Sequence, residues 1–222
     1  MFLAGLKNIF MNMDNTNEES VVMNKSEMIE KLRDYLPERR MVHSMNVAKS
    51  AMELCDIYGG DREKAEIAGI LHDVAKYVKF SDVESYCHKY GIELDDIEKT
   101  NTSLSHSILG MYIAKNEFGI DDEEILNAIR FHTTGRPAMS LLEKIIFIAD
   151  VVEVGRDYPG VDIVRELAFG GELEEAIVHS IDGTISVVLS KKAVLHTRTV
   201  EARNYYVKLI KDREKARNSV VI

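Results

Sequence analysis

Apolar residues recur along most of this chain at spacings of three and four, which is the period of an amphipathic helix. One such stripe consists of Met41, Met45, Ala48, Met52 and Cys55. No stretch of the sequence sustains the strict apolar–polar alternation of a half-buried strand, and only three prolines interrupt the helical pattern. The pattern therefore predicts an all-α protein.

Capping and stop signals divide the pattern into ten predicted helices. The first opens at Asn24, with Glu27 completing a capping box, and runs to Leu36. The second carries the stripe above and stops at Gly59-Gly60, and the third starts at Asp61 and contains His72-Asp73. The others are expected at 81–90 (capped by Ser81 and Glu84), 104–118, 121–132 (capped by Asp121 and Glu124), 138–152, 161–169, 172–192 and 199–216.

Length and patterning favour a single domain. At 222 residues the chain can bury one sizeable core, and nothing in the sequence marks an internal boundary. Residues 1–23 are mildly apolar at first and then polar and acidic, so we expect a flexible N-terminal extension before one helical domain over 24–218. The apolar part of the extension is too short to cross a bilayer, and no other segment is apolar enough to do so.

The overall charge limits the classes of partner. A formal net charge of −9 argues against binding to nucleic acid or to an anionic membrane. The two cysteines, Cys55 and Cys87, have no CxxC spacing and fall in helical patterns, which favours reduced thiols and a cytoplasmic location. Apolar faces on the late helices would allow a homodimer, although periodicity does not prove one.

Four histidines and two aspartates fall on the apolar faces of the predicted helices, where an unpaired polar group is costly. They are His43, His72, Asp73, His106, His132 and Asp150. A single inward histidine is usually an ordinary core residue, but six such groups are hard to satisfy by chance. A metal centre satisfies them together, and mixed imidazole and carboxylate ligands suit iron, manganese, cobalt or zinc better than calcium or magnesium.

Six ligating groups can hold two ions, and such a pair is typical of phosphoester and phosphoanhydride hydrolysis. His72 and Asp73 are adjacent on one predicted helix and diverge by about 100°, so Asp73 could bridge both ions while His72 binds one. Lys76 follows on the same helical face and is the candidate cation beside the reacting phosphate. Asp73 and Lys76 are therefore the predicted catalytic residues, although Lys76 could also be a plain surface charge near a helix end.

Hydroxyl groups and cations near these ligands are candidates for binding phosphate. His132 is followed by Thr133, Thr134, Gly135 and Arg136, which offer two hydroxyls, a flexible turn and a guanidinium fork. Gly135 could equally be an ordinary helix stop. Further candidates, each with a plain alternative as a helix-surface residue, are Arg40, Arg156, Thr199, Arg203 and Asn204.

In this order the residues resemble the HD-domain superfamily of metal-dependent phosphohydrolases, whose name denotes the His-Asp pair represented here by His72-Asp73. Over residues 26–210 the chain looks like the YqeK family of bacterial symmetrical diadenosine-tetraphosphate hydrolases. The likeness is carried by RRMVHSMNVA (39–48), AGILHDVAK (68–76), LSHSILG (104–110) and AIRFHTTGRPAMSLLEKIIFIADVVE (128–153), and is extended by PGVDIVRELA (159–168) and TVEARN (199–204).

The resemblance implies a helical bundle with a two-metal centre in its core. One ion would be held by His43, His72, Asp73 and Asp150, and the second by Asp73, His106 and His132. The cofactors would be two divalent or mixed-valence transition-metal ions, with iron the first choice and cobalt, manganese or zinc as alternatives. The substrate would be a small dinucleoside polyphosphate that is split symmetrically, with ADP or GDP as product.

Two alternatives stay open at this point. The chain could be an HD-domain nucleotidase acting on another nucleotide, or a non-catalytic nucleotide-binding regulator that keeps the fold. The complete set of six ligands argues against the regulator. The sequence departs from the family's usual pattern at Glu153-Val154-Gly155-Arg156, where a glutamate-proline pair is common, and at Thr197, where a proline is common. These departures affect the expected shape of the pocket rather than the ligands.

Overall fold

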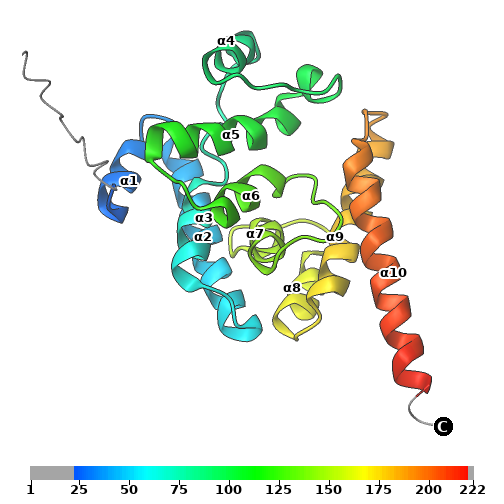
Figure 1. Ribbon diagram of the computed structural model, residues 1–222. Helices are drawn as coiled ribbons and strands as arrows, with labels where there is room; N and C mark the ends of the chain where they lie inside the picture. The colour runs from blue at the N-terminus through cyan, green and yellow to red at the C-terminus, as the bar shows by residue number, and fades with distance from the viewer. Residues whose placement is uncertain (1–22, 220–222) are drawn as a thin grey trace, which may run out of the picture.

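The structure, a computed structural model, describes residues 23–219, and this part of the chain is helical with no strand (Figure 1). The predicted all-α fold is therefore confirmed, whereas the predicted extension at 1–23 lies outside the described residues apart from Met23. The elements are α1 (Lys25–Leu32), α2 (Glu38–Tyr58), α3 (Arg62–Leu71), α4 (Phe80–Tyr90), the 3-10 turn η1 (Glu98–Thr100), α5 (Thr102–Phe118), α6 (Glu123–Phe131), α7 (Leu141–Val152), α8 (Val161–Phe169), α9 (Leu173–Ser190) and α10 (Thr197–Ser219).

Several predicted helix ends are confirmed and others are wrong. Asn24 and Glu27 form the predicted capping box, and glycines end α2, α4 and α5 as expected. α1 stops at Leu32 rather than Leu36, because the N–H groups of Arg33, Asp34 and Tyr35 donate three residues back and form a tighter turn after the helix. α6 is capped by Asp122 instead of Asp121, and α4 starts after Lys79 without a side-chain cap.

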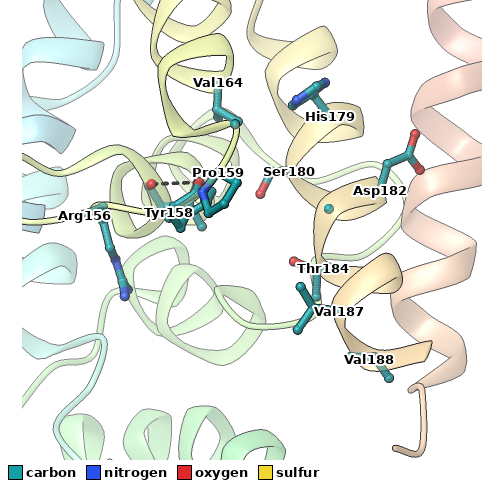
Figure 2. A pocket seen from close by; sticks show the side chains of 13 residues that line it. Arg156, Tyr158, Pro159, Val164, His179, Ser180, Asp182, Thr184, Val187 and Val188 are labelled. Carbon is teal, nitrogen blue, oxygen red and sulfur yellow. Dashed lines mark hydrogen bonds between the residues drawn. The ribbon is translucent and has the colours of Figure 1, made fainter. Parts of the chain in front are cut away.

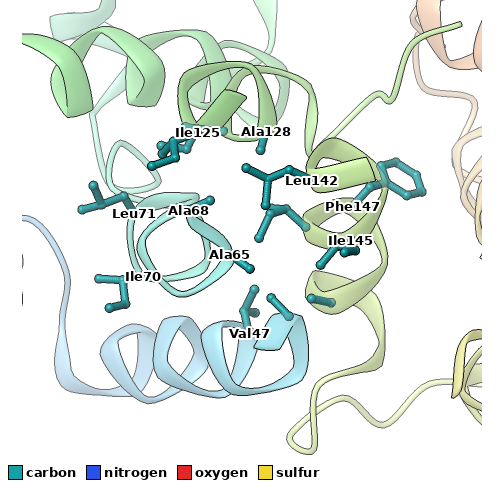
Figure 3. Packing of buried hydrophobic residues seen from close by; sticks show 14 of the residues in the cluster. Val47, Ala65, Ala68, Ile70, Leu71, Ile125, Ala128, Leu142, Ile145 and Phe147 are labelled. Carbon is teal, nitrogen blue, oxygen red and sulfur yellow. The ribbon is translucent and has the colours of Figure 1, made fainter. Parts of the chain in front are cut away.

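The core forms around α3, which packs against α2, α6 and α7. Figure 3 shows the residues that meet there, including Val47 of α2, Ala65, Ala68 and Leu71 of α3, Ile125 and Ala128 of α6, and Leu142 and Ile145 of α7. Small side chains at Ala48 and Gly69 let α2 and α3 approach each other closely. A Cβ atom on Gly69 would lie 2.6 Å from the Cα atom of Ala48, so the backbones of α2 and α3 nearly touch. This close crossing brings the helix of His43 against the turn that carries His72 and Asp73.

The C-terminal helices form the other side of the domain. α9 packs on α7, α8 and α10, and α10 lies along α9 (Figure 1). Tyr206 of α10 is fully buried, and its hydroxyl accepts a hydrogen bond from the Met139 N–H (3.0 Å), which ties α10 to the loop before α7. Over residues 23–219, no helix combines the length and apolar character needed to cross a bilayer.

Candidate metal centre

Asp73 stands at the middle of the six predicted ligands. Its Oδ1 atom lies 3.1 Å from His106 Nε2 of α5 and 3.6 Å from His132 Nε2 at the end of α6. Its Oδ2 atom lies 3.6 Å from His72 Nε2 and 3.8 Å from His43 Nε2 of α2. One carboxylate therefore faces all four histidines, with a different pair on each oxygen.

Asp150 closes the side of the centre that contains His43 and His72. Its Oδ1 atom lies 3.0 Å from His43 Nε2 and 3.7 Å from His72 Nε2. His43 and His72 are buried, and the Asp150 side chain is 19% exposed, so the centre opens to solvent on the Asp150 side. All six residues singled out in the sequence thus converge, from α2, α5 and α7 and from the turns that follow α3 and α6.

His72, Asp73 and His132 lie just beyond helix ends, and the prediction that His72 and Asp73 sit within a helix is wrong. α3 ends at Leu71 and α6 ends at Phe131. The reason is that each histidine Nδ1–H donates to the carbonyl oxygen three residues earlier, Gly69 or Ile129, both at 2.7 Å. Carbonyl groups at a helix end have no partner within the helix, so an imidazole can take that place.

The same arrangement fixes the tautomer of all four histidines. The Nδ1 atom of His106 lies 3.3 Å from the Thr102 carbonyl oxygen, and that of His43 lies 3.1 Å from Glu153 Oε1. Because a carbonyl or carboxylate oxygen can only accept, each Nδ1 carries a proton, and in the neutral imidazole each Nε2 then presents a lone pair to the centre. Outer acceptors of this kind orient histidines that bind metals.

These inward lone pairs fit a cation. His106 Nε2 and His132 Nε2 are 3.1 Å apart although neither carries a proton, and two lone pairs repel at that distance. Within the described residues, the buried atoms His72 Nε2 and Asp73 Oδ1 have no hydrogen-bond partner, which is costly for buried acceptors. Divalent transition-metal ions among these six residues would satisfy both requirements.

The ionisation states agree with this fit. Burial opposes charge on Asp73, but the surrounding imidazoles of His72, His106 and His132 hold the pKa of this carboxyl well below its usual range. The Asp150 pKa is also well below its usual range, because the nearby imidazoles of His43 and His72 and the charge of Arg156 outweigh burial. Burial lowers the pKa of His106 to about 4. At neutral pH the two carboxylates are thus ionised and His106 is neutral, which are the forms that bind metal.

Four of the predicted substrate-binding residues border the centre. Arg40 Nη1 donates to Asp73 Oδ2 at 2.9 Å, and Lys76 Nζ lies 3.3 Å from Asp73 Oδ1. Arg156 donates to the carbonyl oxygen of Asp150 (2.6 Å) and also to its carboxylate. The hydroxyl of Thr133 lies 3.2 Å from His132 Nε2. These groups form a polar rim at the solvent side of the ligands.

The structure does not bring the other candidates to the ligands. Arg136 is held by Glu143 through two hydrogen bonds of 2.6 Å and stacks on the Phe131 ring. The Thr134 hydroxyl donates to the carbonyl of Gly135, whose φ of +63° makes the turn after α6. The remaining candidates lie on α10: Thr199 is buried, Arg203 pairs with Asp182, and Asn204 is exposed. The sequence does not indicate that the buried Glu143 binds Arg136.

Glu153 is a residue that the sequence reasoning missed as part of the site. It is buried, accepts from His43 Nδ1, and also accepts from Asn46 Nδ2 at 3.0 Å and from the Gly155 N–H at 2.6 Å. Its spacing of three residues from Asp150 places both carboxylates near one side of the helix end, and this spacing was the available signal.

Another histidine with two carboxylates lies away from this centre, where the loop before α5 meets the start of α10. His196 Nδ1 accepts a hydrogen bond from the Arg198 N–H (3.1 Å), so its Nε2 carries the proton and donates to Asp95 Oδ2 (2.8 Å). Glu98 in turn accepts from Arg198 at 3.2 Å and lies 3.6 Å from Arg130. His196 has no inward lone pair, so this cluster does not offer the ligands of a metal site.

A buried His–Asp centre in an all-helical domain is the mark of an HD-type metal-dependent hydrolase, and the comparisons agree. The family model of the HD domain matches residues 40–155, which contain all six predicted ligands. The chain is 38% identical over 175 residues to a symmetrical bis(5'-nucleosyl)-tetraphosphatase of Staphylococcus aureus, covering 78% of this chain and 90% of that one. It is 40% identical over 182 residues to the protein of the same name from Halalkalibacterium halodurans, covering 82% and 96%.

A solved structure gives the same result. A predicted HD superfamily hydrolase involved in NAD metabolism from Clostridium acetobutylicum is 45% identical and superposes with a TM-score of 0.81, over 84% of this chain and 98% of that chain. The chain belongs to the HD-domain family and, within it, to the symmetrical bis(5'-nucleosyl)-tetraphosphatases. The family resemblance and the helical-bundle fold predicted from the sequence are therefore confirmed.

Proposed function

We propose that this protein hydrolyses diadenosine tetraphosphate and related dinucleoside polyphosphates symmetrically, giving two nucleoside diphosphates. The observation that carries the proposal is the set of inward-facing acceptors around Asp73, in a chain whose curated relatives bear the name of this activity. The proposed ligand sets are His43, His72, Asp73 and Asp150 for one ion, and Asp73, His106 and His132 for the other. Iron is the proposed metal, with cobalt, manganese or zinc as alternatives.

Two divalent ions held there would supply Lewis-acid stabilisation of phosphoryl oxygens and a water of lowered pKa. The chain contributes the charges around them. Arg40, Lys76 and Arg156 neutralise the ligand carboxylates here. With the carboxylates of Asp73 and Asp150 bound to metal ions, these three cations would be available to the oxygens of an incoming polyphosphate.

Lys76 is the cation best placed for the reacting phosphate. Its side chain is 31% exposed, and its Nζ atom lies 3.3 Å from Asp73 Oδ1 and 3.2 Å from His106 Nε2, between the ligands and solvent. A fixed positive charge at that position stabilises the negative charge that develops on the phosphoryl oxygens. Thr133 offers a hydroxyl donor on the neighbouring side.

The proposal includes the setting in which the enzyme works. A small nucleotide as the sole substrate, without nucleic acid or membrane, fits the net charge of −9. A cytoplasmic location is supported by Cys55 and Cys87, which are both free thiols. Partly exposed Tyr205 and Leu209 on α10 would suit a homodimer contact.

Product analysis tests the proposal. Protein stripped of metal and reloaded separately with iron, cobalt, manganese or zinc would be incubated with diadenosine tetraphosphate, and the nucleotides separated by chromatography. We expect ADP as the sole product, no turnover after chelation, and the fastest turnover with iron. ATP plus AMP would contradict symmetrical cleavage, and no turnover with any metal would contradict the proposed substrate.

A further inference from the structure

We propose that the cavity beside α9 binds the nucleoside of one half of the substrate, an inference that rests on the proposed function. The cavity has a volume of about 570 Å³ and lies between the loop after α7 and the second half of α9 (Figure 2). Small-molecule pockets in proteins typically measure roughly 300–1,000 Å³, so a nucleoside can be accommodated.

The cavity lies beside the candidate metal centre. Val151, which follows the ligand Asp150, forms part of its wall, and the Tyr158 hydroxyl donates to the Val151 carbonyl at 3.0 Å. Arg156 lines this cavity and also a smaller one of about 280 Å³ that contains His43 and Glu153. Because Arg156 binds Asp150 as well, its guanidinium joins the cavity to the ligands.

The walls of the cavity match the chemistry of a nucleoside. Tyr158 and Pro159 on the loop face Val187 and Val188 on α9 across the space, which gives two largely apolar sides (Figure 2). Ser180 and Thr184, one helical turn apart on α9, add hydroxyl groups to the wall, whereas Asp182 points toward α10 and pairs with Arg203. A purine has two apolar faces and a polar edge, and a ribose has hydroxyls that can hydrogen-bond to the hydroxyls of Ser180 and Thr184. The positive end of the cavity, at Arg156, is the side on which phosphates would leave it.

The second half of α9 is also unusual as a surface helix. Residues 183–190 contain no charged side chain, and Val187 is 51% exposed although it lines the cavity. A nucleoside lying against Val187 would remove part of that apolar surface from water, which favours binding.

This position explains symmetrical cleavage. If the base lies against α9 and Arg156 holds the phosphates that follow it, the phosphorus that reaches Asp73 and Asp150 is fixed by its distance from the base. One nucleoside pocket is enough, since the substrate is symmetrical and either half can enter. The cavity is therefore assigned two roles: it selects a nucleoside, and it determines which phosphoanhydride bond of the substrate is broken.

The test is a matched pair of substitutions on α9, Val187→Trp inside the cavity and Leu189→Trp outside it. Both side chains are largely exposed, 51% and 62%, so neither change disturbs the core. Binding of ADP and of inorganic pyrophosphate to metal-loaded protein would be measured by isothermal titration calorimetry, which does not depend on turnover. Pyrophosphate carries the same phosphates without a nucleoside.

We expect Val187→Trp to weaken ADP binding by roughly tenfold or more, because the indole occupies the nucleoside's space. Pyrophosphate binding should be the same in both variants and in the unchanged protein, and Leu189→Trp should bind ADP normally. Unchanged ADP binding in Val187→Trp, or equal losses in both variants, would overturn the assignment. A protein that binds ADP as expected but fails to hydrolyse diadenosine tetraphosphate would instead contradict the proposed function alone.

Discussion

Two clusters of histidine and carboxylate in this protein have similar compositions and opposite hydrogen bonding. Around Asp73, each histidine Nδ1 donates outward to a carbonyl or to Glu153, so the Nε2 lone pairs converge. In the second cluster, His196 Nδ1 accepts from a backbone N–H, and its Nε2–H donates to Asp95. Arginines satisfy the neighbouring Glu98.

The comparison indicates that the tautomer, and not the residue types alone, distinguishes a candidate metal site from a hydrogen-bonded cluster. When the imidazole N–H points toward the carboxylate, the two side chains hydrogen-bond to each other. When the N–H points away from it, the unprotonated nitrogen and the carboxylate can both bind a cation. The tautomer is set by the backbone group that each Nδ1 meets. That group depends on where helices end, which is a property of the fold.

The largest expected difference between the clusters is in turnover. Asp73→Ala should lower the rate of ADP formation by at least about a thousandfold, since both ions lose their shared ligand. Asp95→Ala should change the rate by less than about threefold, as for most surface substitutions. Metal analysis of the purified variants gives an independent measure, and substantial activity in Asp73→Ala with little bound metal would refute the two-ion mechanism.

The backbone that sets the tautomer can be disturbed without touching a ligand. Gly69→Ala should lower the free energy of unfolding by about 1–3 kcal/mol, since the added methyl group would meet the backbone of Ala48. Activity should fall as well, because the Gly69 carbonyl orients His72. The control is Gly183→Ala on α9, where no atom lies within 4 Å and a helical alanine should stabilise by about 0.5–1 kcal/mol. Equal effects on thermal unfolding would contradict this account of the α2–α3 crossing.

The outer acceptor of His43 is expected to have a smaller effect. Glu153→Gln should weaken metal binding by about 10–100-fold, which is the usual loss when such a partner is altered. Competition with a chelator of known affinity measures this directly. Glu53→Gln, at a half-exposed position on the same helix as His43, is the control and should leave the affinity unchanged.

The smallest effect concerns pH and the second cluster. Burial opposes the charge of Asp95, but hydrogen bonds from the Glu98 N–H and from His196 lower its pKa. A carboxyl with a depressed pKa stabilises the fold above its unfolded pKa of about 4, and this contribution is lost as the pH falls. Asp95→Asn should therefore cost less than about 1 kcal/mol at neutral pH, and the difference should vanish near pH 2–3. Urea unfolding across this range would show it, and a difference that persists in acid would refute it.

Much of the fold follows from the sequence, because helix positions depend on local patterns. The apolar period located all ten α-helices of the described residues, and Asn24, Gly59, Gly91 and Gly119 marked their ends. The 3-10 turn at Glu98–Thr100 was not predicted from the sequence, since three residues are too few to show a hydrophobic period. The cap of α6 was displaced by one residue because two adjacent aspartates offer the same signal.

The candidate ligands could be picked out from the sequence for a different reason. A polar residue on an apolar face is conspicuous, and six of them pointed to one centre. The partners of the surface arginines could not be predicted, because no local sequence pattern indicates which distant carboxylate a long charged side chain will reach. Arg156 and Arg40 reach the ligands, whereas Arg136 and Arg203 meet Glu143 and Asp182. Only the packing of distant helices decides between these outcomes.

The two oxygens of Asp73 also determine how such a site can decay during evolution. Oδ1 faces His106 and His132, and Oδ2 faces His43 and His72. A lineage that loses His106 or His132 would keep a complete half and become a one-ion protein. A lineage that loses Asp73 would lose both halves in a single step, so intermediate forms of the centre should retain the His-Asp pair.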